Sequence, residues 1–194
     1  MTAGGLVGVP DPSQLFGSTH PGEIGAAVGC VLEGTRPILL EVQALVAPTD
    51  LAMPRRVATG VDPRRLAMIV AVLGRHAGVA LASADVFVNV AGGVKIEEPG
   101  ADLAVALAIA SASRGTSVLE GAAAFGEIGL TGRLRAASQA ERRLDECAKL
   151  GIGTVVAPAG IPARADLRMS GAETLRDAIK AGLATPAAVR EAAA

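Results

Sequence analysis

The residues best placed to do chemistry lie in the loop 94–102, which has the sequence VKIEEPGAD. It follows an expected strand and leads into a strongly apolar helix, and loops of this shape often carry a nucleophile at the helix entrance. The four side chains there, Pro99 to Asp102, include no hydroxyl and no thiol. Glu97 and Glu98 could in principle form an acid/base pair, but solvated carboxylates or salt bridges to partners are the favoured interpretation.

Several common catalytic motifs are missing from the sequence. No GxxxxGK[ST] motif is present to cradle ATP phosphates in the manner of a P-loop, and neither GxSxG nor HExxH occurs. The two histidines are His20 and His76. His76 falls near the end of an expected helix, where a cation complements the helix dipole, so a structural role is favoured for it. The sequence thus excludes the common hydrolase chemistries and predicts no metal site.

Paired arginines are the second group of interest. Guanidinium groups suit phosphate contacts, which set affinity without reading base sequence. Arg64 and Arg65 fall in the first turn of an expected helix, where positive charge is unfavourable by roughly 0.3 to 1 kcal/mol, a hint that something else keeps them there. DNA contacts and subunit contacts are equally favoured, with a solvated face as the third interpretation. The DNA-binding candidates are Arg55, Arg56, Arg64, Arg65, Arg133 and Arg135.

Composition limits the possible classes of protein. The 194 residues are 51% hydrophobic but only 2% aromatic, which fits one domain with a core of small aliphatic residues. A formal net charge of -1 restricts any nucleic-acid surface to a local patch. Cys30 and Cys147 lie in apolar segments and are expected to be reduced and buried. Without a signal peptide or an apolar stretch long enough to cross a membrane, the chain is expected to be soluble and cytoplasmic.

Hydrophobic periodicity predicts the elements that position these residues. Strands at 26–32 and 37–46 form a hairpin, and the second strand alternates apolar residues with a wetter row containing Glu41 and Gln43. A helix opens with Asp62 as N-cap and Pro63 at its first position, and it stops near Gly78.

The later segments predict further strands and helices. The run of Val86, Val88 and Val90 predicts a strand, and the all-apolar helix from about 101 to 113 should be central and buried. Ser138 and Glu141 have the spacing of a capping box that begins another helix. The remaining expected elements are two short strands within 122–137, a buried strand at 154–157 and a last helix at 170–182. The order predicts an α+β sandwich with mixed strands.

Long, ordered motifs give the sequence a family resemblance. Residues 86–111 and 125–158, with the upstream stretches VPDPSQLF, GTRPILLEVQALV and PRRVATGVDPRRLAMIVAVLGRHAG, resemble the Lon-protease-like C-terminal domain of the bacterial RadA/Sms DNA repair protein family. The similarity runs from Gly5 to about Lys180. It implies a ribosomal protein S5 domain 2-like fold related to the Lon peptidase domain, with a mixed sheet and packed helices.

The resemblance also implies a domain organisation and partners. Residues 1–22 would be a linker or arm from a missing preceding ATPase domain, 23–184 the Lon-protease-like domain, and 185–194 a flexible tail. The parent family is a DNA-dependent ATPase that uses ATP, magnesium and zinc in domains outside this chain, so no cofactor is expected here. The implied partners are DNA, other copies of the chain in a homohexameric ring, and recombinases.

The family's peptidase relatives use a catalytic serine and lysine, and this sequence has neither residue at the corresponding positions. The resemblance places the serine at Gly100 and the lysine at Glu141. Without the nucleophile and its base, the resemblance implies a pseudo-protease: a scaffold that supports ring formation and backbone-driven DNA binding for a motor located elsewhere. An active Ser-Lys peptidase and a pure oligomerisation module are the alternative hypotheses.

Overall fold

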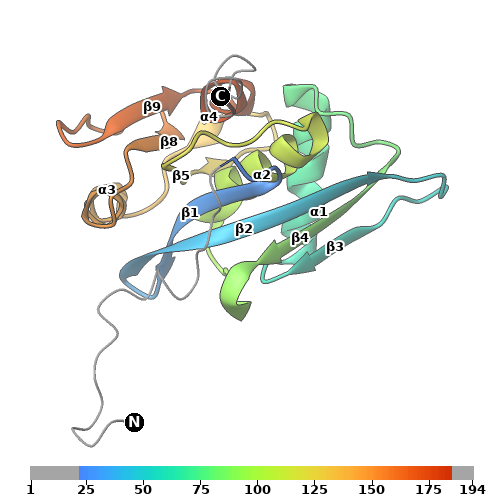
Figure 1. The fold of residues 1–194 in the computed structure, drawn as a ribbon, viewed down its shortest axis with the longest axis horizontal. Coiled ribbons are helices and arrows are strands. Elements are labelled where there is room, and N and C mark those ends of the chain that lie inside the picture. Colours follow the sequence, from blue (N-terminus) through green and yellow to red (C-terminus); the bar gives the residue numbers. More distant parts are fainter. Residues whose placement is uncertain (1–21, 185–194) are drawn as a thin grey trace, which may run out of the picture.

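A computed structural model describes residues 22–184, and Figure 1 shows their fold. The expected arm at 1–22, apart from Gly22, and the expected tail at 185–194 lie outside the described residues. Within 22–184 the chain forms a mixed α/β structure with a seven-stranded sheet and four α-helices. The strands of this sheet run in the order β3-β4-β2-β1-β5-β8-β9, and β6 and β7 form a separate two-stranded ribbon.

The predicted hairpin is confirmed and forms the centre of the sheet. Strands β1 (Ala26–Glu33) and β2 (Arg36–Pro48) pair antiparallel along their length. Strand β4 (Ala84–Val90) pairs antiparallel with β2 on the other side, and its buried row is Val86, Val88 and Val90 as predicted. In the row predicted to be wetter Gln43 is exposed, but Glu41 is buried, and its Oε1 accepts a hydrogen bond from the side-chain amide of Gln43.

Helix α1 (Pro63–Val72) begins where the sequence predicted it would. The Asp62 carboxylate accepts hydrogen bonds from the backbone N–H groups of Arg64 and Arg65, so the predicted N-cap is confirmed. The helix continues as a π-helical turn, η2 (Leu73–Ala77), and Gly78 ends it with a φ of 66°, a left-handed conformation that glycine adopts without strain.

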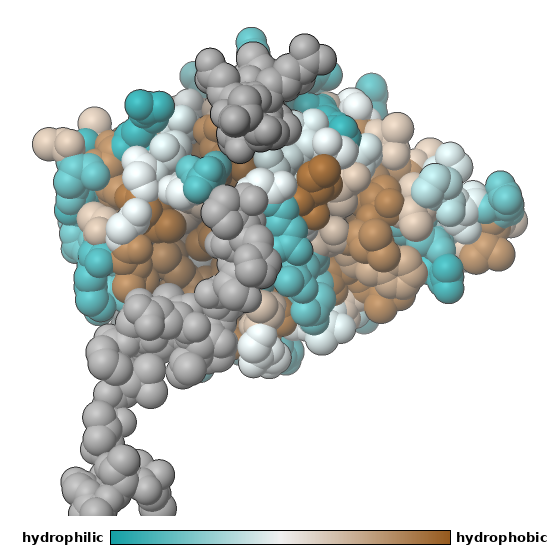
Figure 2. Space-filling view, viewed as in Figure 1, coloured by the Kyte–Doolittle hydropathy of each residue, from teal (hydrophilic) through white to brown (hydrophobic). Residues whose placement is uncertain are grey.

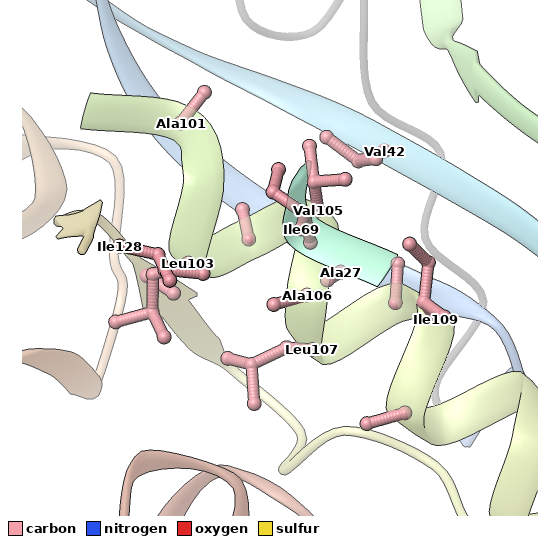
Figure 3. Packing of buried hydrophobic residues seen from close by; sticks show 14 of the residues in the cluster. Ala27, Val42, Ile69, Ala101, Leu103, Val105, Ala106, Leu107, Ile109 and Ile128 are labelled. Carbon is pink, nitrogen blue, oxygen red and sulfur yellow. The ribbon is translucent and has the colours of Figure 1, made fainter. Parts of the chain in front are cut away.

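Helix α2 (Asp102–Arg114) is the buried centre of the main core. Every residue from Asp102 to Ser111 is buried, which confirms the prediction from its all-apolar sequence. Figure 3 shows Leu103 beside Ile128, and Val105 beside Ile69 of α1. Helix α4 (Leu175–Gly182) adds to the same core, so α1, α2 and α4 cover one face of the sheet.

Helix α3 (Ala140–Lys149) covers part of the opposite face and has a smaller core of its own. Leu144 and Cys147 pack there against Cys30 of β1, Leu39 of β2 and Phe125. The strands beneath the far side of this core are β5 (Ala122–Ala124) and β8 (Thr154–Pro158), which run parallel to each other. The two cores on opposite faces explain why the central strands are apolar on both sides.

Two strands were not predicted from the sequence. Strand β3 (Arg56–Thr59) runs parallel to β4 at one edge of the sheet, and β9 (Arg168–Ala172) runs parallel to β8 at the other. The predicted last helix therefore began too early, because residues 170–172 belong to β9 and Thr174 is the N-cap of α4. The short ribbon of β6 (Glu127–Ile128) and β7 (Leu134–Arg135) matches the two strands expected there, while β5 joins the main sheet.

The half of the sheet beyond α3 has an exposed apolar row. Leu45 of β2 and Val57 of β3 both pair with Phe87 of β4, and their side chains lie on the face opposite α1 and α2. Leu45 is 61% exposed and Val57 is 45% exposed. Figure 2 shows hydrophobic residues gathered over these strands, in the right half of the view. Within residues 22–184 no helix is long and apolar enough to span a bilayer.

Candidate functional site

The loop between β4 and α2 is held against the rest of the domain by backbone hydrogen bonds. It contains the 3-10 turns η3 (Ala91–Gly93) and η4 (Pro99–Ala101). The Gly100 carbonyl accepts a hydrogen bond of 2.7 Å from the Gly126 N–H, and the Gly126 carbonyl accepts one of 3.2 Å from the Leu103 N–H. The entrance of α2 is therefore fixed to the segment between β5 and β6.

A buried ion pair fills the space beside Gly100. Arg143 of α3 donates to both carboxylate oxygens of Glu98, at 2.7 and 2.6 Å. Glu98 also accepts from the Leu32 N–H at 2.9 Å, and Arg143 donates to the carbonyls of Cys30 at 2.6 Å and Ser138 at 2.9 Å. The Arg143 side chain is 0% exposed. Since the planar guanidinium has a carboxylate and two carbonyls as acceptors, its charge is well compensated.

A side chain at position 100 would require the ion pair to shift. A Cβ atom on Gly100 would lie 2.6 and 2.9 Å from the two carboxylate oxygens of Glu98, and 3.0 Å from Nη2 of Arg143. Such distances are shorter than normal contacts between carbon and oxygen or nitrogen. At the position where the resemblance places a serine, the Glu98 carboxylate and the Arg143 guanidinium lie against the place that a Cβ atom would take.

Glu141, the position where the resemblance places the lysine, is exposed on the first turn of α3. It is two residues from Arg143, or about 200° around the helix at about 100° per residue, so the helix presents Arg143 to the loop. The predicted capping box is wrong. The N-cap residue is Gln139 with a φ of 54°, no side chain caps the helix, and the Ser138 carbonyl accepts from Arg143 instead.

A second ion pair fastens α1 to the start of α2. Arg65 donates from Nε to Asp102 Oδ1 at 2.7 Å and from Nη2 to Oδ2, and the Ile128 N–H donates to Oδ2 at 3.0 Å. Burial raises the pKa of the Asp102 carboxyl, and the bonds from Arg65 and Ile128 offset part of this effect. The pair accounts for a cation in the first turn of α1, which the sequence left without an explanation.

A cavity of about 550 Å³ lies between the loop and the amino-terminal end of α1. Its polar lining includes Asp62, Arg64 and the exposed Lys95–Glu97 pair, whose charged atoms are 3.1 Å apart. Because most of the cations and carboxylates around it are already paired with each other, the cavity has no concentrated charge of one sign.

The arginines near β3 have internal partners. Arg55 donates from its backbone N–H at 2.7 Å and from Nε at 2.8 Å to the carboxylate of Asp85, and its guanidinium lies 5.5 Å from the centre of the Phe87 ring. Arg56 donates to the carbonyls of Ala84 and, at 2.7 Å, Leu81. Both side chains therefore hold the edge of the sheet to the turn before β4.

The other candidate arginines are separated in the structure. Arg64 is exposed at the start of α1, far along the helix from η2. Arg133 precedes β7 and forms an exposed salt bridge of 3.4 Å to Glu173, whereas Arg135 lies on β7 itself. Among residues 22–184, the Arg64 and Arg135 side chains have no recorded hydrogen-bond or ion-pair partner, so these two cations are available to a ligand.

Hydrophobic periodicity did not identify the buried charges of Arg143 and Glu41. Arg143 falls at i+3 in the stripe that contains Ala140, Leu144 and Cys147, so its position on the buried side of α3 could have been inferred. Glu41 is 2% exposed, and its Oε2 has no hydrogen-bond partner. No pattern in the sequence distinguishes it from the exposed Gln43 two residues later.

The cysteines and the remaining candidate nucleophiles have structural positions. Cys30 and Cys147 are buried free thiols, as predicted. The hydrogen bond with Cys147 is the main cause that raises the pKa of Cys30, and burial raises this pKa further. Ser111 is fully buried and its hydroxyl accepts from the Gly25 N–H at 2.8 Å. Nowhere in residues 22–184 do three or more His, Cys, Asp or Glu side chains gather in a way that could hold a metal ion.

Comparisons with known proteins confirm the part of the resemblance that concerns bacterial RadA proteins. Residues 59–161, more than half of the chain, match the family model described as subunit ChlI of Mg-chelatase. DNA repair protein RadA of Brucella abortus is 50% identical over 161 residues, which are 82% of this chain and 34% of the relative. RadA of Halalkalibacterium halodurans is 40% identical over 188 residues, 94% of this chain and 41% of the relative.

A third RadA protein is similar to this chain over most of the chain's length. DNA repair protein RadA of Bacillus subtilis is 44% identical over 156 residues, 80% of this chain. The chain spans 34 to 41% of the length of these relatives. Since the family model covers over half of the chain and the RadA proteins align over most of it, the chain belongs to the family described as subunit ChlI of Mg-chelatase and is a homologue of the bacterial DNA repair protein RadA.

Proposed function

We propose that this chain is a non-catalytic, Lon-protease-like scaffold in a RadA-type recombinational DNA repair protein. In this proposal the chain has the ribosomal protein S5 domain 2-like fold and assembles as a homohexameric ring. It helps to hold DNA by contacts to the phosphate backbone of the DNA. The DNA-dependent ATPase that drives branch migration, and any recombinase partner, lie outside the chain. The relatives are DNA repair proteins by name, which supports the repair role.

The observation that carries the proposal is the buried Glu98–Arg143 pair beside Gly100. A serine at position 100 would force the Glu98 carboxylate or the Arg143 guanidinium to shift, and complete loss of a buried ion pair costs about 3 to 5 kcal/mol. The loop therefore keeps the shape of a protease entrance while the space for a nucleophile is used to stabilise the fold. This favours a structural role over hydrolysis.

Neither of the serines in α2 supports a peptidase at this loop. The hydroxyl of Ser111 is used by the Gly25 N–H, and Ser113 lies a further half turn along the helix, near its end. Lys95, the lysine of the loop, is exposed and paired with Glu97. A Ser-Lys dyad requires the lysine to be within hydrogen-bond reach of the serine, and no such contact is recorded for Lys95.

The exposed apolar row of Leu45, Phe87 and Val57 supports self-association. Its side chains are adjacent across three strands on a sheet face that α3 does not cover. An apolar patch of adjacent residues is typical of a surface that another protein covers. The same observation favours the second candidate function, a pure oligomerisation module, which differs in having no affinity for DNA.

Peptide hydrolysis, light scattering and DNA titration together test this proposal. We expect no turnover of casein or a fluorogenic peptide by the purified chain, a multi-subunit mass by light scattering, and binding of labelled duplex DNA that weakens with salt. Turnover that disappears on Ser111→Ala or Ser113→Ala would establish the peptidase instead. Assembly without a salt-dependent DNA shift, unchanged by Arg55→Ala with Arg56→Ala, would establish the pure oligomerisation module.

A further inference from the structure

We propose that the carboxyl-terminal end of α1–η2 and the adjoining side of α4 bind the phosphate backbone of nucleic acid. The inference rests on the proposed DNA role and gives that role a location. It concerns the η2–α4 basic surface, which consists of Arg75, His76, Arg114, Arg133, Arg176 and Lys180. Only Arg133 in this group belongs to the arginine pairs that the sequence singled out.

Tight backbone contacts bring these residues together from distant parts of the chain. A Cβ atom on Gly132 would lie 2.7 Å from Cβ of His76, so the turn before β7 packs directly on the end of η2. The Leu175 N–H donates to the Gly132 carbonyl at 2.8 Å, which fixes the start of α4 to the same turn. Figure 1 shows η2 and α4 near each other along the upper edge of the molecule.

Two of the arginines connect the elements through the last carbonyls of η2. Arg176 of α4 donates from Nε to the His76 carbonyl at 3.2 Å, and Arg114 of α2 donates from Nη2 to the Ala77 carbonyl at 3.2 Å. Each guanidinium has five N–H groups in a planar fork, so these single bonds leave donors available. Both side chains belong to exposed residues, and the remaining donors can reach a phosphate oxygen.

The surface has an excess of positive charge. Arg75, Arg114, Arg133, Arg176 and Lys180 are all exposed. The carboxylates on the same segments are Glu173, 3.4 Å from Arg133, and Asp177, which accepts from the Thr174 hydroxyl at 2.6 Å. A third carboxylate, Glu120, lies near the carboxyl-terminal end of α4, because the N–H of the preceding Leu119 donates to the Gly182 carbonyl. Cations therefore outnumber carboxylates here in a chain whose net charge is -1.

Stabilisation of the helix end accounts for only part of this charge. Cations near a helix carboxyl terminus stabilise it only modestly, and Arg114 and Arg176 already donate hydrogen bonds to the terminal carbonyls. Within residues 22–184, Arg75 and Lys180 have no recorded side-chain partner and project from two different elements. Exposed cations from several elements that flank one short surface suit the repeated negative charges of a nucleic-acid backbone.

The surface contrasts with the arginines around β3 and the start of α1. Arg55 and Arg65 are neutralised by Asp85 and Asp102, and Arg56 donates to backbone carbonyls. A phosphate would have to displace these partners to bind the arginines around β3 and α1. It could bind Arg75 and Lys180 without displacing any partner found in residues 22–184. The η2–α4 basic surface is therefore the better phosphate site of the two.

The test is a salt titration of a fluorescein-labelled DNA duplex with the full chain and two matched double variants. Arg75→Gln with Lys180→Gln removes two cations of the surface without removing a recorded hydrogen bond. Arg36→Gln with Arg168→Gln is the control, since it removes two exposed cations from the β1–β2 hairpin and from β9. Unchanged melting temperatures confirm that both variants fold.

The surface variant should lower the slope of log affinity against log salt by about 1.8, because each lost phosphate contact contributes about 0.9. At 0.1 M salt this corresponds to a loss of affinity of about 60-fold, and the control should change neither quantity. Equal losses in both variants, or none in the surface variant, overturn the location. Failure of the unmodified chain to bind duplex overturns the proposed DNA role itself. Equal binding to phosphatidylserine vesicles, lost in the same variant, would reassign the surface to a membrane.

Discussion

Glu98→Ala is the substitution that most directly tests how the loop is built. It removes a carboxylate that accepts from both Nη atoms of Arg143 and from the Leu32 N–H. The Arg143 side chain, which is 0% exposed, then keeps its charge inside the protein without a counterion. Two carbonyl acceptors remain to it, those of Cys30 and Ser138.

The expected loss of stability follows from the burial of Arg143. Removing one partner of a buried ion pair costs about 3 to 5 kcal/mol, because the remaining charge is desolvated without compensation. For a domain of this size each kcal/mol lowers the melting temperature by about 2 to 4 °C. We therefore expect Glu98→Ala to melt about 6 to 20 °C below the unmodified chain.

Glu97→Ala is the matched control, one residue away in the same loop. Glu97 pairs with Lys95, but their side chains are 78% and 77% exposed, so the pair is screened by water. Its loss should cost less than about 1 kcal/mol. Urea and thermal unfolding followed by circular dichroism measure both variants. If Glu98→Ala and Glu97→Ala were equally stable, the ion pair would not support the loop and our reason for the glycine at position 100 would be refuted.

Three further substitutions have defined outcomes. Gly100→Ser should destabilise the fold in urea unfolding without producing peptide hydrolysis, since its Cβ would lie 2.6 Å from Glu98; a stable variant would contradict this. Arg55 holds the pKa of Asp85 below its usual value near 4, so Asp85→Asn should be less stable at pH 7, by a difference that shrinks as the pH falls below about 4. A constant difference from pH 7 to pH 3 argues against this pair. Gly132→Ala should lower the melting temperature, because Gly132 has a φ of 77° and an added Cβ atom would lie 2.7 Å from Cβ of His76. An unchanged melting temperature would show that the turn can move away from His76.

Elements with a local signal were predictable from the sequence. The hairpin alternates apolar residues, α1 has Asp62 and Pro63 at its start, and α2 is apolar all round, so each is specified by its own residues. Strands β3 and β9 have only 4 and 5 residues and pair parallel with strands more than ten residues away along the chain. Such strands depend on their neighbours more than on their own composition, so the sequence did not reveal them.

The residue types of the candidate site can be read from the sequence, whereas its contacts cannot. The missing hydroxyl at Gly100 and the missing amine at Glu141 are visible in the sequence. The partners of Glu98 and Asp102 are not, since Arg143 and Arg65 lie 45 and 37 residues away along the chain. Charge pairing over such separations depends on how the helices pack, which no local pattern encodes.

The packing around Gly100 also limits which mutational routes are open to the protein. A route to a working serine enzyme needs a serine at position 100, a lysine on α3, and the removal of Glu98 and Arg143 from the intervening space. A serine at position 100 made first would crowd the Glu98 carboxylate, and removal of Glu98 alone would leave the buried charge of Arg143 without its counterion. These two steps therefore lower stability before any activity can be gained, and the ion pair acts as a barrier against the acquisition of proteolysis.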